Sequence, residues 1–248
     1  MTYVLIMPLQ FLNGRVMGAR IRHAATTSAQ DPSPSRAVPT PRRVARARLR
    51  SWDRSAARFS NHATWHPPTM TRLRTVTTAE LTRAELEALR ELLFGAFGGR
   101  FEEHDWEHTL GGVHLLALED DAPVAHGAVV PRVLVAGERQ LATGYVEGVA
   151  TREDRRGRGL ATLVMREVGR VIERDYELGA LSDGTRIPGF YQRLGWETWQ
   201  GPTWVAGPEG RERTAEEDGS VLVLRTPASG ELELTGSLTC DWRPGDVW

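Results

Sequence analysis

The spacing of apolar residues changes several times between Met70 and Trp248, and each change indicates a new element. A Thr-rich stretch leads into apolar positions at helical spacing, which predicts a first helix. The segment EHDWEHT predicts a short second helix. Residues 113–151 then read as three or four strands separated by the turn signals EDDAP and AGERQ, and such short links imply antiparallel pairing. The apolar positions of the first helix are Leu81, Leu86, Leu89, Leu93 and Phe97.

The second half of the chain mixes helices and strands. One apolar side over 157–172 predicts a helix, LGALSD predicts a short strand, and residues 188–194 predict a small helix that Gly195 ends. The tail from Trp196 adds two or three strands, of which VLVL and ELELTGSLTC are the clearest. This order predicts an α+β fold in which helices flank a mixed central sheet, in one domain over residues 70–248.

Residues 1–69 differ in composition from the rest. Over 24–70, Pro, Ser, Ala and Arg occur without sustained apolar periodicity, so the segment buries too little surface to offset the entropy of ordering, and we expect disorder. Up to Met70, 11 arginines and two acids give a net charge of +9, against −10 from Thr71 onward. A transit peptide or a nucleic-acid-binding arm fits this composition. Our hypothesis is a third interpretation, in which translation starts near Met70.

Composition excludes several classes of protein. No run reaches the roughly 18 apolar residues that a membrane-spanning helix needs, so we expect no membrane insertion. The single cysteine, Cys240, excludes an internal disulfide, a cysteine zinc cluster and a CxxC redox pair, and a cytoplasmic location is the natural expectation. His104 and His108 are spaced i, i+4 but lack the glutamate of an HExxH site, so we expect no metal.

The segment REDRRGRG lies between the strand-like YVEGVAT and the helix predicted after it. Helix N-termini have unpaired N–H groups and partial positive charge, and glycines at 157 and 159 let a diphosphate approach the backbone. The spacing fits neither a Walker loop nor a GxGxxG dinucleotide fingerprint. A phosphate cradle, a solvated basic helix start and a nucleic-acid patch all remain open, although the acidic surroundings disfavour the last.

RGRG in this position resembles the acetyl-CoA pyrophosphate motif of the GNAT superfamily of N-acyltransferases, [RQ]xxGx[GA], with Asp154 departing from its first place. Further segments resemble the aminoglycoside 2′-N-acetyltransferases: DWEHTLGG, GYVEGVA, LGALSD, YQRLGW, GPT and CDWRPGDVW. The resemblance covers about Leu73 to Trp248. It implies a GNAT fold, acetyl-CoA as co-substrate, no metal, and transfer of acetyl to a 2′-amine.

The resemblance also implies roles for single residues. Glu147 would take the proton of the amine, directly or through water, and Tyr191 would give a proton to the CoA thiolate. From residue type alone, an edge-facing charge or a half-buried ion pair is the favoured role of Glu147, and a core tyrosine with a structural hydrogen bond is the favoured role of Tyr191. The acetyl-CoA contacts implied are Val149, Ala150 and Thr151 for the pantetheine arm and thioester, and Arg156, Gly157, Arg158, Gly159, Leu160 and Ala161 for the diphosphate.

The net charge of −10 from Thr71 onward suits a polycationic substrate. Arg100 stands where the family has an acid before Phe101, which keeps open a cell-wall amino sugar, a polyamine or a protein amine as substrate. A nucleic-acid binder that uses the basic extension is a weaker alternative, and edge strands in the C-terminal region make a homodimer plausible. The implied substrate contacts are Glu147, Gly148, Ser182, Glu217, Asp246 and the terminal carboxylate of Trp248.

Overall fold

The computed structural model describes residues 70–184 and 187–248. The expectations for residues 1–69, disorder and a translation start near Met70, therefore lie outside the described residues. Within the described part, no helix is long and apolar enough to cross a membrane.

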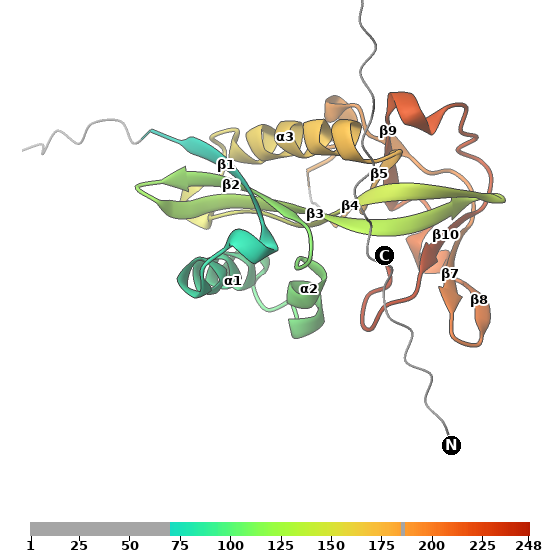
Figure 1. Cartoon of the computed structure of the whole chain (residues 1–248), viewed down its shortest axis with the longest axis horizontal. Helices are drawn as coiled ribbons and strands as arrows, with labels where there is room; N and C mark the ends of the chain where they lie inside the picture. The colour runs from blue at the N-terminus through green and yellow to red at the C-terminus, as the bar shows by residue number, and fades with distance from the viewer. Residues whose placement is uncertain (1–69, 185–186) are drawn as a thin grey trace, which may run out of the picture. The chain divides into compact units, whose positions relative to one another are not determined.

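Three long strands form the centre of the sheet (Figure 1). β2 (Val113–Glu119), β3 (Ala122–Ala136) and β4 (Arg139–Thr151) pair antiparallel in chain order. The link between β2 and β3 consists of Asp120 and Asp121, whose φ angles of 50° and 61° are the positive values that a type I′ turn requires. The turn EDDAP therefore makes the hairpin that the sequence predicts.

Helices cover both faces of this centre (Figure 1). Successive residues of a strand point to opposite faces, so Leu115 packs beneath α3 (Leu160–Asp175) while its neighbour Leu116 packs beneath α1 (Arg83–Phe97). α2 (Glu103–His108) lies on the same side as α1. The sheet is thus the middle of three layers, which agrees with the expected mixed central sheet flanked by helices.

β4 and β5 (Leu178–Ser182) run parallel but soon diverge. They pair only through Thr143–Tyr145 of β4, after which β5 continues along β9 (Val221–Arg225). The last part of β4 therefore pairs with β3 alone among the described strands. This divergence leaves one edge of β4 open next to the loop that leads into α3.

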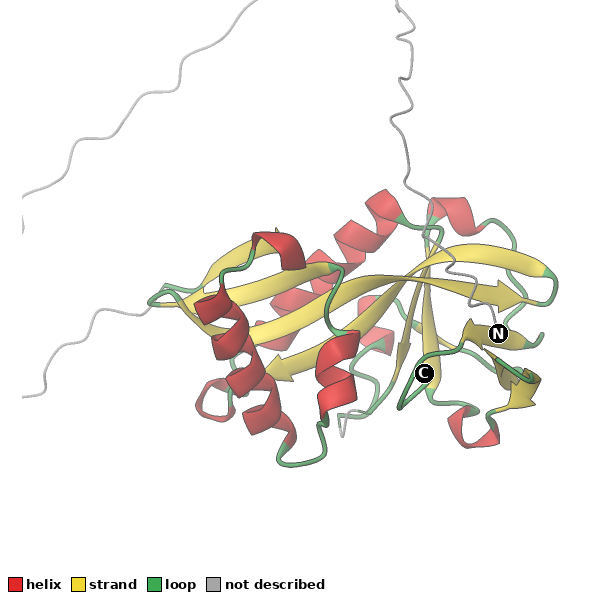
Figure 2. Cartoon of the chain, turned by 60° about the horizontal axis from the view of Figure 1, so that its bottom comes forward, coloured by secondary structure: helices red, strands yellow, loops and turns green. Residues whose placement is uncertain are grey.

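The C-terminal part of the chain extends the sheet in both directions (Figure 2). On one side, β6 pairs with β9. On the other side, β10 pairs antiparallel with the end of β3 and parallel with β7, and β8 forms the edge. Because β10 lies beside β3, the residues that follow it return to the centre of the molecule. The bounds are β6 Glu197–Thr198, β7 Thr203–Gly207, β8 Gly210–Arg213 and β10 Leu238–Asp241.

The sequence did not predict strand β1, and the tail from Trp196 holds five strands, β6 to β10, where two or three were expected. Arg72–Thr77, expected as the approach to the first helix, is strand β1 and pairs antiparallel with β2. Only Val76 of this strand is buried. The segment therefore shows almost no apolar alternation, and pairing with β2 rather than burial accounts for its extended shape.

Predicted bounds also differ from those observed. The helix expected over 157–172 begins at Leu160, because the two glycines before it take backbone angles outside the helical region. The small helix expected over 188–194 is a 3-10 turn at Gln192–Leu194. Only the last three residues of ELELTGSLTC belong to a strand, β10. The first two helices and the hairpins of β2, β3 and β4 are confirmed.

Candidate active site

The loop between β4 and α3 has the backbone shape of an anion site. Gly157 and Gly159 have φ of +77° and +78°, and Gly159 is the N-cap of α3. A Cβ at either position would meet no atom within 4 Å, so conformation rather than crowding requires glycine there. The first N–H groups of this 16-residue helix, at Leu160 and Ala161, lack helical partners and carry partial positive charge.

Two arginines of this loop are already paired with acids. Arg152 and Arg155 both form ion pairs with Asp154, and Arg155 Nε also donates to the Glu119 carboxylate at 2.6 Å. These hydrogen bonds hold the carboxyl pKa of Glu119 and of Asp154 below their usual values. The residue that departs from the family motif, Asp154, thus neutralises part of the loop's positive charge.

The other two arginines differ in what they contact. Arg156 Nη2 donates to the main-chain oxygen of Ala96 at 3.0 Å, which ties the loop to the last turn of α1. Arg158 is exposed, and among the described residues neither of the two forms an ion pair with an acid. Arg158 is therefore the arginine best placed to face an incoming phosphate.

Gly148 forms a bulge in β4. The register with β3 changes between His126 and Ala128, so that Gly127 faces both Gly148 and Val149. Gly148 has φ of +57°, which favours glycine at this point. The predicted pantetheine contacts follow directly after the bulge, on the part of β4 that has left β5: Val149, Ala150 and Thr151.

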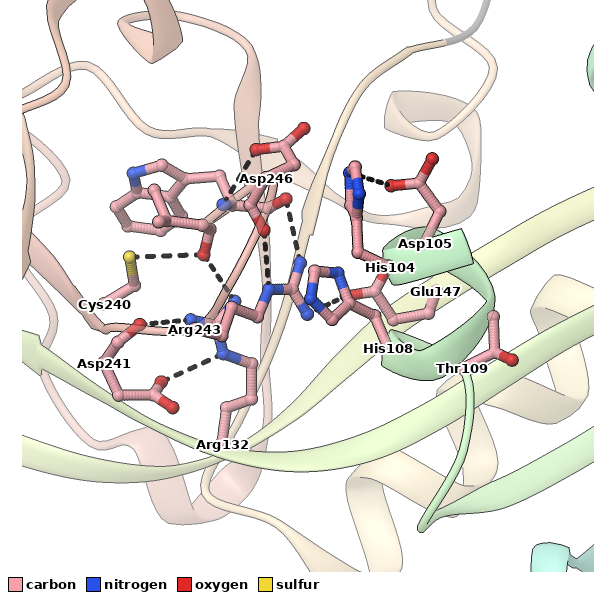
Figure 3. A network of polar contacts seen from close by, with 12 residues as sticks. His104, Asp105, His108, Thr109, Arg132, Glu147, Cys240, Asp241, Arg243 and Asp246 are labelled. Atoms are coloured by element: carbon pink, nitrogen blue, oxygen red, sulfur yellow. Dashed lines mark hydrogen bonds and ion pairs between the residues drawn. The ribbon is translucent and has the colours of Figure 1, made fainter. Parts of the chain in front are cut away.

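Glu147 lies just before the bulge, and only 15% of its side chain is exposed. Arg243 Nη1 donates to Glu147 Oε1 at 2.5 Å (Figure 3). Burial raises the pKa of Glu147 to about 7, although the Arg243 charge and hydrogen bond act to lower it. The half-buried ion pair considered from the sequence is present, and it leaves a carboxyl that can exchange a proton near neutral pH.

Arg243 also binds the end of the chain (Figure 3). Its Nη2 donates to the main-chain oxygen of Trp248 at 3.0 Å, and its Nε donates to that of Asp246 at 2.8 Å. The Trp248 N–H donates to Asp246 Oδ1 at 3.1 Å. Three residues that the sequence assigns to the substrate site, Glu147, Asp246 and Trp248, therefore meet at one guanidinium.

A second pair of predicted substrate contacts is also brought together. Ser182 Oγ, at the end of β5, donates to Glu217 Oε2 at 2.9 Å, and Ser220 Oγ donates to the same oxygen at 2.6 Å. Trp248 Nε1 donates to Thr214 Oγ1 at 2.9 Å, just before the turn that carries Glu217. Hydrogen bonds and two intervening residues thus link the two groups of predicted contacts.

Tyr191 lies in the core beneath α3, with 6% of its surface exposed. Its ring packs edge-on against Phe190 and Trp196, with centroids 4.9 Å and 6.2 Å away. Burial raises the pKa of the Tyr191 phenol, and the nearby Asp183 acts in the same direction. The phenol therefore stays protonated at neutral pH and can donate a proton or a hydrogen bond.

His104 and His108, the two histidines of α2, contact the C-terminal turn. His108 Nε2 lies 2.9 Å from the main-chain oxygen of Pro244, and burial together with the Arg243 charge lowers its pKa to about 4. The ring of His104 fills the space beside Gly245, where a Cβ would come within 2.2 Å of it. α2 therefore supports the turn that carries Arg243.

Arg100, which the sequence singled out beside Phe101, is exposed and follows the C-cap of α1. The tryptophans of the C-terminal part differ in exposure: Trp196, Trp199 and Trp248 are buried in the core, whereas Trp242 is half exposed.

The sequence did not predict three residues of the site, Arg243 and the buried Arg132 and Tyr145. Arg132 donates to Asp241 Oδ1 at 2.9 Å and to the main-chain oxygen of Val247 at 2.8 Å, which fixes the C-terminal segment to β3. The Tyr145 ring lies 4.8 Å from the Arg132 guanidinium and 5.5 Å from that of Arg243. An arginine inside the apolar run of β3 was the available signal, because a buried charge needs partners.

Comparison with known proteins agrees with this architecture. The acetyltransferase (GNAT) domain family matches residues 77–199. An aminoglycoside 2′-N-acetyltransferase of Mycolicibacterium fortuitum is 48% identical over 177 residues, which are 71% of this chain and 91% of that protein.

Among solved structures, a GNAT family N-acetyltransferase of Escherichia coli in complex with CoA matches 71% of this chain and 92% of its own, with 19% sequence identity and a TM-score of 0.51. At that identity the likeness shows a shared fold, and it confirms the α+β arrangement that the sequence predicts. The 48% identity to the M. fortuitum protein covers most of that relative's length. The chain therefore belongs to the GNAT acetyltransferases.

Proposed function

We propose that this protein transfers the acetyl group of acetyl-CoA to the 2′-amine of aminoglycosides. The observation that carries the proposal is Glu147, a buried carboxyl at the bulge of β4 whose pKa is raised to about 7. It lies where β4 leaves β5, on the strand that leads into the glycine loop before α3. The 48% identical relative is an aminoglycoside 2′-N-acetyltransferase, which supports the same chemistry here.

The donor would bind along the open edge of β4. The N-terminus of α3 and Arg158 would hold the diphosphate, and main-chain groups of Val149, Ala150 and Thr151 would hold the pantetheine arm and polarise the thioester carbonyl. Gly157 and Gly159 supply the backbone angles that this loop needs, and no side chain there obstructs a ligand.

The acceptor would bind over Glu147, Gly148, Ser182, Glu217, Asp246 and the carboxylate of Trp248. A neutral amine attacks the thioester carbon, so that a C–N bond forms and the C–S bond breaks. Glu147 takes the proton that the amine loses, and Tyr191 gives a proton to the departing thiolate. Proton exchange with solvent then returns Glu147 to its ionised form and Tyr191 to its protonated form. The products are the acetamide and free CoA.

The test is release of CoA thiol from acetyl-CoA over a panel of amines, with kcat/KM measured for each. We expect gentamicin and tobramycin to exceed polyamines and amino sugars, and NMR of the product to place the acetyl group on the 2′-nitrogen. A higher kcat/KM for a polyamine, an amino sugar or a protein amine would reject the aminoglycoside as the preferred substrate. The assignment of acetyltransferase activity would still stand.

A homodimer is also proposed. All four residues of the edge strand β8 (Gly210–Arg213) are exposed, and this strand pairs only with β7 among the described strands. A free edge can pair with a second copy of the chain. Sedimentation equilibrium tests this, and a monomer at micromolar concentration would contradict it.

A further inference from the structure

A chain of hydrogen bonds runs through the interior from the bulge of β4 to the loop before β2. His126 Nδ1 lies 2.7 Å from the main-chain oxygen of Gly148, and His126 Nε2 lies 2.9 Å from His114 Nδ1. His114 Nε2 lies 2.9 Å from Thr78 Oγ1, which accepts from the Gly111 N–H at 3.0 Å. Both imidazoles are completely buried. None of these side chains has a role in the proposed mechanism.

The hydrogen-bond partners determine which ring nitrogen of His126 and of His114 carries the proton. The Gly148 oxygen can only accept, so His126 Nδ1 must donate and the Nε2 of the neutral ring must accept. His114 then donates from Nδ1 and accepts at Nε2 from the Thr78 hydroxyl, for which the His114 nitrogen at 2.9 Å is a closer acceptor than the Gly112 main-chain oxygen at 3.3 Å. Every donor along the chain points toward the bulge, and a proton added to either ring would disturb this order. Burial favours the neutral rings, since it lowers the pKa of His126 to about 3 and that of His114 to about 4.

The hydrogen bond from His126 determines the orientation of one peptide group. In a trans peptide, the C=O of one residue and the N–H of the next point in opposite directions. When His126 holds the Gly148 oxygen, the N–H of Val149 must point away from His126. The side chains of Thr109 and His126 also pack against the Cα of Gly148, where a Cβ would approach them to 2.9 Å and 3.4 Å. The bulge is therefore held by contacts from outside β4.

We propose that His126, held in one tautomer by His114, is a positioning residue that directs the Val149 N–H toward the thioester carbonyl of the acetyl donor. The inference deepens the proposed function and rests on acetyl-CoA binding along β4. A correctly oriented N–H stabilises the oxyanion that forms as the amine attacks. The same bulge turns β4 between Glu147 and Val149, so that base and oxyanion donor keep a fixed geometry.

Two substitutions at position 126 separate orientation from stability. In His126→Asn the amide nitrogen replaces Nδ1 and can still donate to Gly148, but His114 loses its acceptor. In His126→Gln the amide group lies near Nε2, so it can accept from His114 but no longer reaches Gly148. Of these two variants, His126→Asn should be the less stable but the more active one.

The assays are kcat for thiol release, the acetyl-CoA Kd by calorimetry, and Tm, all with the full chain. We expect kcat to fall about 10- to 100-fold in His126→Gln and by no more than about fivefold in His126→Asn, because misplacing one oxyanion donor has effects of this size. Acetyl-CoA should bind more tightly to the Asn variant, although its Tm is lower. If activity follows Tm, so that the Gln variant retains more kcat, the proposal is overturned.

A second pair of variants, at position 114, keeps the proposal testable if the variants at position 126 do not fold. His114→Asn keeps a donor to His126 and should retain kcat, whereas His114→Gln removes that donor and should lower it; equal activity of these two variants would contradict the proposal. Failure of the proposed function can be distinguished from failure of the positioning role, because the wild-type protein would then release no thiol with any aminoglycoside. The order of acetyl-CoA affinities between His126→Asn and His126→Gln would still test the positioning role.

Discussion

Replacing Arg243 with glutamine should move the pH dependence of the reaction toward higher pH. Glu147 must be ionised to accept the proton of the amine, so activity is lost as the pH falls through its pKa. Burial raises that pKa to about 7, and Arg243, 2.5 Å away, is the largest influence that lowers it. Without the guanidinium, burial is opposed only by the weaker influence of Arg132, so the pKa of Glu147 rises further.

The size of the effect follows from the geometry. An opposite charge within about 4–6 Å lowers a carboxyl pKa by about 1–3 units. Only 13% of the Arg243 side chain and 15% of the Glu147 side chain are exposed, so solvent screens this pair less than a surface ion pair. Each unit corresponds to about 1.4 kcal/mol, so the lost interaction is about 1–4 kcal/mol. At neutral pH, kcat/KM should fall about 5- to 500-fold and recover as the pH is raised.

The assay is kcat/KM for the aminoglycoside between about pH 5.5 and 10, measured for the wild type, Arg243→Gln and Arg243→Lys. The amine of the substrate titrates identically in all three, so the difference between profiles reports Glu147. The acid limb of Arg243→Gln should lie about 1–3 pH units above that of the wild type, whereas Arg243→Lys keeps a cation and should stay within about one unit. An acid limb of Arg243→Gln at or below the wild-type position would refute the reasoning.

Four further outcomes are expected. Glu147→Gln should lower kcat about 10²- to 10⁴-fold without changing the acetyl-CoA Kd, since only the base is lost; an unchanged kcat would remove Glu147 from the mechanism. Tyr191→Phe should lower kcat with little change in Tm, because the ring that packs on Trp196 is kept; a kcat equal to wild type would leave it a core residue. Gly159→Ala, at φ +78°, should cost about 1–2 kcal/mol and raise the acetyl-CoA KM, whereas Gly169→Ala within α3 should not. Glu217→Gln should raise the aminoglycoside KM about tenfold while Glu212→Gln on the exposed β8 leaves it unchanged, and equal effects would show mere loss of charge.

How far the sequence predicts the fold depends on how strongly each segment is buried. α1 and the strands β2 to β4 have one or two buried faces, so their apolar spacing is clear. β1 has a single buried residue and is extended because it pairs with β2, which local spacing does not reveal. The start of α3 was placed three residues early, because the positive φ of the preceding glycines depends on the tertiary shape of the loop.

The sequence predicted only part of the site, because some of its contacts also depend on the tertiary structure. The resemblance to a known family pointed to Glu147 and Ser182, but the partner of Glu147 is Arg243, 96 residues away in sequence. That contact depends on β10 returning beside β3, and no spacing along the chain encodes it. The contact between His114 and His126 could have been predicted, since the two residues are diagonal neighbours on one face of the β2–β3 hairpin.

The most direct measurement of the central claim compares two substrates that differ at one position. Kanamycin B carries an amine at the 2′ position, and kanamycin A carries a hydroxyl there. With acetyl-CoA as donor, the account predicts release of CoA thiol with kanamycin B and none above background with kanamycin A. Equal rates with both compounds would contradict transfer to the 2′-amine.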